Sequence, residues 1–94
     1  MINGVTKSGF SFEVDERVIK DWRFIKSMAK LNKGALGQLE GIVEISSIVL
    51  GEKQGLLLEK HIADQDGYID AKEYEEELTE IIKLLKEEDE EIKN

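Results

Sequence analysis

Alternating apolar and polar positions near the start of the chain predict a β-hairpin over residues 2–14. Phe10, Phe12 and Val14 alternate with polar residues, which is the pattern of a strand with one buried face. Gly9 supplies a turn before this second strand. Because an isolated hairpin is only marginally stable, we expect the three apolar side chains to pack against helices.

Helical spacing replaces the alternation after Asp15, which predicts that the rest of the fold, residues 15–86, is helical. Asp15 is a typical N-cap residue, and the apolar positions that follow it, such as Trp22, recur every three or four residues. The sequence therefore predicts one amphipathic helix of about four turns. We expect it to end near Gly34.

The second predicted helix, from Gln38 to Leu50, is apolar on more than one side. Such a helix lies either at the centre of a core or at an interface with another chain, and the sequence leaves both open. Its start is hard to predict because Gly34, Gly37 and Gly41 each disfavour helix by about 1 kcal/mol relative to alanine.

A short third helix is predicted from Glu52 to Ile62, followed by a turn and a last helix that begins after Asp70. The last helix is expected to end in residues 87–94, an acidic tail that should fray because like charges repel and acids sit poorly at a helix C-terminus. The predicted fold class is α+β, mostly α. It is a single domain over residues 1–94, with an N-terminal β-hairpin and about four helices in a small bundle.

Composition narrows the class of protein further. The chain has 94 residues, of which 40% are hydrophobic and 36% charged, as in a small globular domain. No apolar run approaches the roughly 20 residues that span a bilayer, and no apolar signal core follows Met1. We therefore expect a cytoplasmic protein without a membrane segment. The net charge of -8 repels phosphates, which argues against nucleic acid as a partner.

The residues that most enzymes need are missing from this sequence. There is no cysteine, and His61 is the single histidine. The serines lie in no nucleophile elbow, and the glycines form no phosphate-binding loop. We therefore expect no catalytic residues, no cofactor and no enzymatic activity.

The segment from Asp64 to Glu73 carries the sharpest local motif. Asp64, Asp66, Asp70 and Glu73 fall at the third, fifth, ninth and twelfth positions of an EF-hand calcium loop. However, the first position falls on Ile62, which has no side-chain oxygen. A tight turn followed by a helix cap explains the same residues and is favoured, so they form only a weak metal-site candidate.

Basic residues follow one side of the first predicted helix at intervals of three or four. This side is either a solvated face or a docking surface for an acidic partner, which would include the acidic half of a second copy of the chain. A homo-oligomer therefore stays open. The residues of this basic stripe are Lys20, Arg23, Lys26, Lys30 and Lys33.

The order of the motifs resembles a known family. The segment Thr6–Glu16 reads T-K-S-G-F-x-F-x-V-D-E, Asp21–Phe24 reads D-W-R-F, and Ile42–Gly51 reads I-V-x-I-S-S-I-V-L-G. A D-x-D-G-Y turn at Asp64–Tyr68 then leads into an acidic helix. Over roughly residues 4–86 the chain is similar to the small tail assembly chaperones of long-tailed, siphovirus-type phages and prophages of Gram-positive bacteria.

The resemblance implies a function in virion morphogenesis. Proteins of this family bind the long tape-measure protein, keep it soluble, and help recruit tail-tube subunits around it. They work in the host cytoplasm and are absent from the finished virion. A longer form often arises by translational frameshift. The resemblance supplies neither catalytic residues nor a binding motif.

The choice of binding residues therefore comes from patterning. A chaperone of a long helical protein needs exposed apolar surface, and the second predicted helix has more apolar residues than a small core can cover. We expect the exposed parts of that helix, with Trp22 nearby, to contact the partner. The predicted contact residues are Trp22, Leu39, Ile42, Val43 and Ile45. The alternatives are an EF-hand-like calcium-binding regulatory module and a general prophage protein–protein adaptor.

Overall fold

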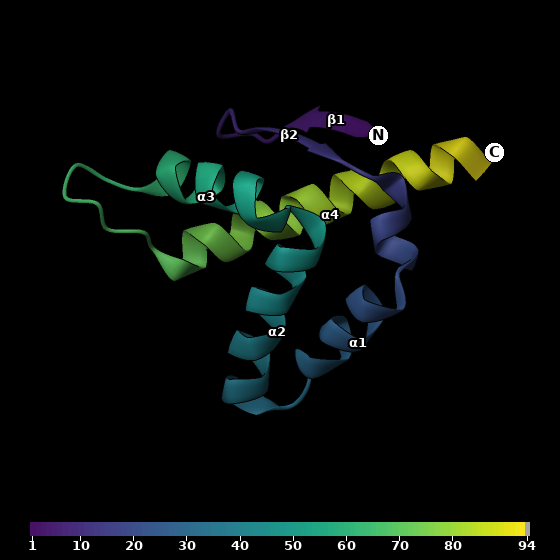
Figure 1. The fold of residues 1–94 in the computed structure, drawn as a ribbon, viewed down its shortest axis with the longest axis horizontal. Coiled ribbons are helices and arrows are strands. Elements are labelled where there is room, and N and C mark those ends of the chain that lie inside the picture. Colours follow the sequence, from purple (N-terminus) through teal and green to yellow (C-terminus); the bar gives the residue numbers. More distant parts are fainter. Residues whose placement is uncertain (94) are drawn as a thin grey trace.

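The computed structural model describes residues 1–93, with side-chain surroundings up to residue 88. A two-stranded hairpin is followed by helices, which confirms the predicted fold class (Figure 1). The elements are β1 (Ile2–Val5), β2 (Ser11–Val14), a 3-10 helix η1 (Glu16–Lys20), α1 (Trp22–Lys30), α2 (Gly34–Val49), α3 (Gly51–Ile62) and α4 (Ala71–Lys93).

The hairpin has the predicted antiparallel pairing and the predicted buried face. Ile2 pairs with Val14, and Val5 pairs with Ser11. Phe10, Phe12 and Val14 are all buried in the shared core. The alternation of period two therefore identified both the strands and the face that contacts the helices.

The predicted four-turn helix after Asp15 is wrong, because the segment is broken into η1 and α1 at Asp21. Asp15 caps η1 by accepting a hydrogen bond from the backbone N–H of Arg17. Asp21 has an extended backbone and accepts one from the N–H of Arg23, so it caps a new helix. Aspartate competes for backbone amides in this way, and here the competition ends one helix and starts the next.

Helix α2 begins at Gly34, four residues before the predicted start, and packs against α1. The reason lies in Gly37 and Gly41, which face the backbone of α1. An added Cβ would lie 2.8 Å from the Lys30 carbonyl oxygen at Gly37 and 2.9 Å from that of Ser27 at Gly41. Close packing thus offsets the low helix propensity of glycine.

The core lies between α4 and the elements on either side of it. The hairpin runs along one side of α4, and the α1–α2 pair projects from the other side (Figure 1). Helix α4 contributes Leu78, Ile81 and Leu85, which are buried. They join a single cluster with Phe10, Phe12, Val14, Phe24, Ile45, Val49, Leu50 and Leu58.

Helix α4 continues to Lys93, past residue 86 where the sequence predicts the helical part to end. Glutamate and lysine are strong helix formers, which favours continuation over the predicted fraying. The side chains of residues 89–94, and the backbone of residue 94, lie outside the part of the chain that is described.

Candidate functional site

A groove of about 840 Å³ lies between α2, α3 and the start of α4. We call it the α2–α3 groove. Its wall on α2 is formed by Leu39, Ile42, Val43, Ser46 and Ser47. Its wall on α3 is formed by Gly51, Glu52, Gly55, Leu56 and Glu59. The remaining lining residues lie on α4 and in the segment before it: Ile69, Ala71, Lys72, Tyr74 and Glu75. The two walls are consecutive helices joined at Gly51, whose φ of +75° permits the sharp change of direction.

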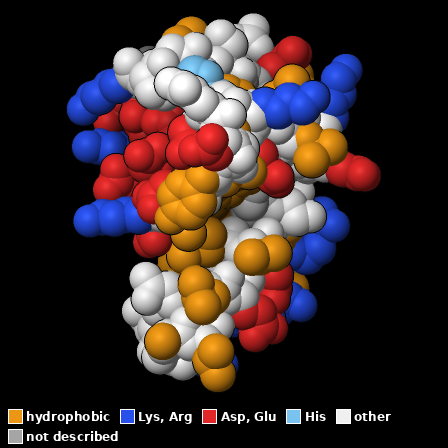
Figure 2. Space-filling model, turned by 90° about the vertical axis from the view of Figure 1, so that its left-hand side faces the viewer, with side chains coloured by type: hydrophobic (Ala, Val, Ile, Leu, Met, Phe, Trp, Pro, Cys, Tyr) orange, Lys and Arg blue, Asp and Glu red, His pale blue; other side chains and the backbone are white. Residues whose placement is uncertain are grey.

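Large aliphatic side chains line this groove without being covered. Leu39 is 58% exposed, Val43 is 70% exposed, and Leu56 on the opposite wall is 51% exposed. Hydrophobic side chains form a band down this face of the molecule (Figure 2). Single exposed aliphatic residues are common on protein surfaces, but several in one concavity are typical of a binding site.

The floor of the groove is held by a contact between α2 and α4. The hydroxyl groups of Ser46 and Tyr74 form a hydrogen bond. Tyr74 and Ile42 are half-buried beside the core cluster. On α3, Gly55 lies beside the Tyr74 hydroxyl, which is 3.8 Å from where a Cβ would be, an ordinary contact distance. The floor is thus part of the folded core, while the rim above it is open.

The charged residues on the rim are mostly acidic. Glu52 and Glu59 lie on the α3 wall, and Glu75 lies on α4. Lys72 is the basic residue among those that line the groove. Acidic side chains border the hydrophobic band on the same face (Figure 2). The groove therefore combines an apolar interior with a rim of negative potential.

The structure brings together three of the five predicted contact residues. Leu39, Ile42 and Val43 line the α2–α3 groove. Ile45 is only 2% exposed and belongs to the core cluster, so its assignment to a partner surface is corrected. Trp22 is 67% exposed at the start of α1 but does not line this groove, so it is not a neighbour of the other residues there.

Sequence reasoning missed the wall on α3. The run Leu56, Leu57 and Leu58 held a usable signal, because three consecutive helical residues cannot all face the core. Leu58 is fully buried, whereas Leu56 and Leu57 are about half exposed. The groove contributions of Ile69 and Tyr74 depend on tertiary packing and have no local signal.

A smaller hollow of about 370 Å³ lies between α1, α2 and α4. It shares Ile42 and Glu75 with the α2–α3 groove, but its other charged residues are Lys83 and Lys86. The two hollows thus lie on either side of Ile42 and differ in the sign of most of their charged residues.

The Asp64–Glu73 segment is a turn and a helix cap. The Asp64 carboxylate accepts hydrogen bonds from the backbone N–H groups of Asp66 and Tyr68, at 2.9 and 3.0 Å. Asp70 caps α4 by accepting one from the N–H of Glu73. In the described residues, no group of three or more His, Asp or Glu is arranged to hold a metal ion. The predicted turn and the helix cap at Asp70 are confirmed.

A polar cluster that the sequence did not reveal joins the hairpin turn to α3 and α4. The Ser8 Oγ lies 3.0 Å from His61 Nε2 and donates a hydrogen bond to Glu77. A carboxylate oxygen can only accept, so the Ser8 hydroxyl is the donor in its contact with Glu77. Thr6 also donates to Glu77, which fixes the turn against α4. The cluster is therefore a structural connection between elements.

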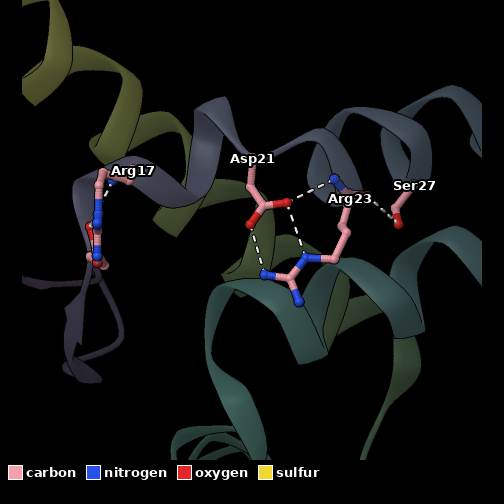
Figure 3. Close-up of polar contacts among 5 residues, drawn as sticks. Arg17, Asp21, Arg23 and Ser27 are labelled. Carbon is pink, nitrogen blue, oxygen red and sulfur yellow. Dashed lines mark hydrogen bonds and ion pairs between the residues drawn. The ribbon is translucent and has the colours of Figure 1, made fainter.

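The basic stripe is partly neutralised within the chain. The Arg23 guanidinium binds the Asp21 carboxylate and lowers the pKa of Asp21 to about 2 (Figure 3). Lys30 forms ion pairs with Glu44 and Glu40, which raise the pKa of its ammonium group. Arg23 and Lys30, two residues of the predicted docking surface for an acidic partner, are thus paired with acids of the same chain.

Comparison of the chain with protein-family models, curated proteins and solved structures finds no match. Among the described helices, none combines the length and the apolar character required to cross a membrane. Function must therefore be inferred from the α2–α3 groove and from the motifs of the sequence.

Proposed function

We propose that this chain is a non-enzymatic assembly chaperone for the tail of a long-tailed phage or prophage. It holds an apolar helical segment of the tape-measure protein in the α2–α3 groove, keeps that protein soluble in the host cytoplasm, and helps recruit tail-tube subunits. It leaves before the virion is complete. The observation that carries the proposal is the exposure of Leu39, Val43 and Leu56 within one groove.

The groove suits a helix of another protein. Its walls are two helices that meet at an angle, and its interior is apolar along both of them. An amphipathic helix laid between them buries its own apolar face and theirs in the same contact. The partner, a long protein with apolar helices before assembly, offers many such faces.

The expected affinity is modest, which a chaperone requires. When the partner covers the exposed parts of Leu39, Val43 and Leu56, each side chain contributes about 1 kcal/mol to the binding free energy. The lost freedom of two associating chains offsets much of this gain. Binding is thus reversible, so that tube subunits can displace the chaperone from the tape-measure protein.

The charges of the chain support the same role. The net charge is -8, and the acidic residues are concentrated in its second half. A soluble complex needs such repulsion between copies when its partner is apolar. The sequence motifs from Thr6 to Tyr68 are the second support, through their resemblance to the tail assembly chaperones.

Co-expression with the tape-measure protein of the same genome tests the proposal. Val43→Asp and Leu56→Asp place a charge inside the groove, and we expect each to leave the tape-measure protein insoluble. Leu36→Asp and Leu57→Asp are matched controls, because both residues are exposed on the same helices but do not line the groove. Thermal unfolding followed by circular dichroism establishes that all four variants fold.

The groove assignment is wrong if folded Val43→Asp and Leu56→Asp keep the partner as soluble as the unchanged chain does. If the unchanged chain never solubilises the tape-measure protein, the chaperone function itself is wrong. A general prophage adaptor would then be the better description. Tube recruitment is measured separately, as tube protein retained on the tape-measure protein with and without this chain.

A further inference from the structure

We infer that the helix bound in the α2–α3 groove is amphipathic, with lysine or arginine residues flanking its apolar stripe on one side. This inference rests on the proposed function, because it takes the groove to be the binding site. It adds the chemical class of the bound segment, which follows from the distribution of charge around the groove.

The α3 wall sets a spacing for the bound helix. Glu52, Leu56 and Glu59 line the groove at i, i+4 and i+7, so they share one face of α3. The two carboxylates are separated by about two helical turns, or roughly 10 Å along the axis. A helix alongside α3 meets them with cations two turns apart and an apolar residue between.

The α2 wall shows that the cations belong on one side only. Its groove residues are aliphatic or serine, and none carries a charge. A helix that lies between the walls therefore turns its apolar stripe towards α2 and the floor at Tyr74. Its basic residues face α3 and Glu75. Lys72 is the exception on the rim, at the end where α4 begins.

The neighbouring hollow makes the preference selective. Its charged residues are Lys83, Lys86 and Glu75, so positive charge prevails there. A basic helix is repelled from that hollow and attracted to the α2–α3 groove, and an acidic helix has the reverse preference. The two surfaces thus discriminate between helices that have the same apolar stripe.

Two synthetic helical peptides of about 18 residues test this inference, since shorter helices are marginal in water. Both carry leucines at i, i+3, i+4 and i+7. One has lysines beside the stripe, two turns apart, and the other has glutamates there. We expect the lysine peptide to bind about tenfold more tightly at low salt, since each exposed ion pair adds a modest factor. High salt should reduce the difference.

A matched pair of variants isolates the acidic rim. Glu52→Gln, Glu59→Gln and Glu75→Gln together remove the rim charges and should reduce the preference to about twofold or less. Glu76→Gln, Glu87→Gln and Glu88→Gln together change the net charge by the same amount at residues that line neither hollow, and should keep most of the preference. Calorimetry measures affinity, and NMR shifts of the Val43 and Leu56 methyl groups locate the peptide.

Equal binding of the two peptides with shifts at Val43 would overturn the inference but leave the groove as a binding site. Failure of both peptides to bind, together with loss of the tape-measure result, overturns the proposed function instead. If sedimentation shows a dimer that Val43→Asp dissociates, a second copy fills the groove and the inference is also wrong.

Discussion

The two faces of α2 use their residues in opposite ways. The face towards α1 carries Gly37 and Gly41, and backbone atoms of α1 come within 3 Å of where their Cβ atoms would lie. The face towards α3 carries Leu39 and Val43, which are largely exposed. The small residues of α2 are thus packed against α1, whereas Leu39 and Val43 on the other face are exposed.

The difference separates stability from binding. A helix selected for stability alone would bury its largest apolar residues and expose its smallest. Here the contact with α1 brings Gly37 and Gly41 close to backbone atoms, while Leu39 and Val43 stay exposed along the groove. The α1 face fixes where α2 projects, and the groove face leaves its apolar side chains exposed, as the proposed binding of a partner helix requires.

The largest expected effect is a loss of stability that separates the core side of α2 from its groove side. Ile45→Ala should lower the free energy of unfolding by about 2–5 kcal/mol, because Ile45 is buried in the core cluster and leaves a cavity. Val43→Ala, two residues away on the groove side, should change it by less than about 0.5 kcal/mol. Urea unfolding followed by circular dichroism measures both. If both variants lost a similar amount of stability, the core face and the groove face of α2 would not differ as described.

The next effect sharpens the account of the glycine face. Gly41→Ala should lower the free energy of unfolding by about 1–3 kcal/mol. The added Cβ would lie 2.9 Å from the Ser27 carbonyl oxygen and 3.0 Å from Leu31 Cδ2. Gly55→Ala is the control, since its nearest neighbour is the Tyr74 hydroxyl at 3.8 Å. Gly55→Ala should raise the free energy of unfolding by about 0.5–1 kcal/mol, because alanine has the higher helix propensity. A gain at Gly41 would contradict close packing as the reason for glycine there.

A smaller effect on stability distinguishes the groove face from a poorly packed core. Leu39→Asp should change the free energy of unfolding by less than about 1 kcal/mol, because the side chain is mainly solvated. Binding of the lysine-flanked peptide should nevertheless fall below detection, since a charge then enters the apolar interior. A large loss of stability would place Leu39 in the core, and unchanged peptide binding would exclude it from the site.

The smallest effect concerns α1, the element that supports the glycine face. Arg23 lowers the pKa of Asp21 from its ordinary value of 3.8 to about 2. The resulting stabilisation is present above pH 3.8 and is lost as the pH falls towards 2. Asp21→Asn retains a capping side chain but removes this dependence. The thermal midpoint between pH 5 and pH 2 should thus fall slightly less in the variant, and an equal fall would contradict the assignment.

Local signals predicted some elements well. The hairpin followed from alternation at Phe10, Phe12 and Val14, and the start of α4 followed from the Asp70–Glu73 capping box. Both depend on neighbours within a few residues. The break at Asp21 was missed because an aspartate within a helical pattern can be either a solvated residue or a cap.

The candidate site was predicted only on one wall. Leu39, Ile42 and Val43 were found because an excess of apolar residues is visible in the sequence. Ile45 was assigned wrongly, since the pattern showed that α2 is apolar on several sides but not which side faces the core. The wall at Leu56 and the floor at Tyr74 depend on how α3 and α4 pack, which no local pattern encodes.

Gly51 joins the two walls of the groove, so one uninterrupted stretch, residues 39–59, encodes both of them. The floor at Tyr74 is encoded separately, on α4. Because the same stretch, residues 39–59, supplies Ile45, Val49, Leu50 and Leu58 to the core cluster, the shape of the groove walls is tied to the packing of the core.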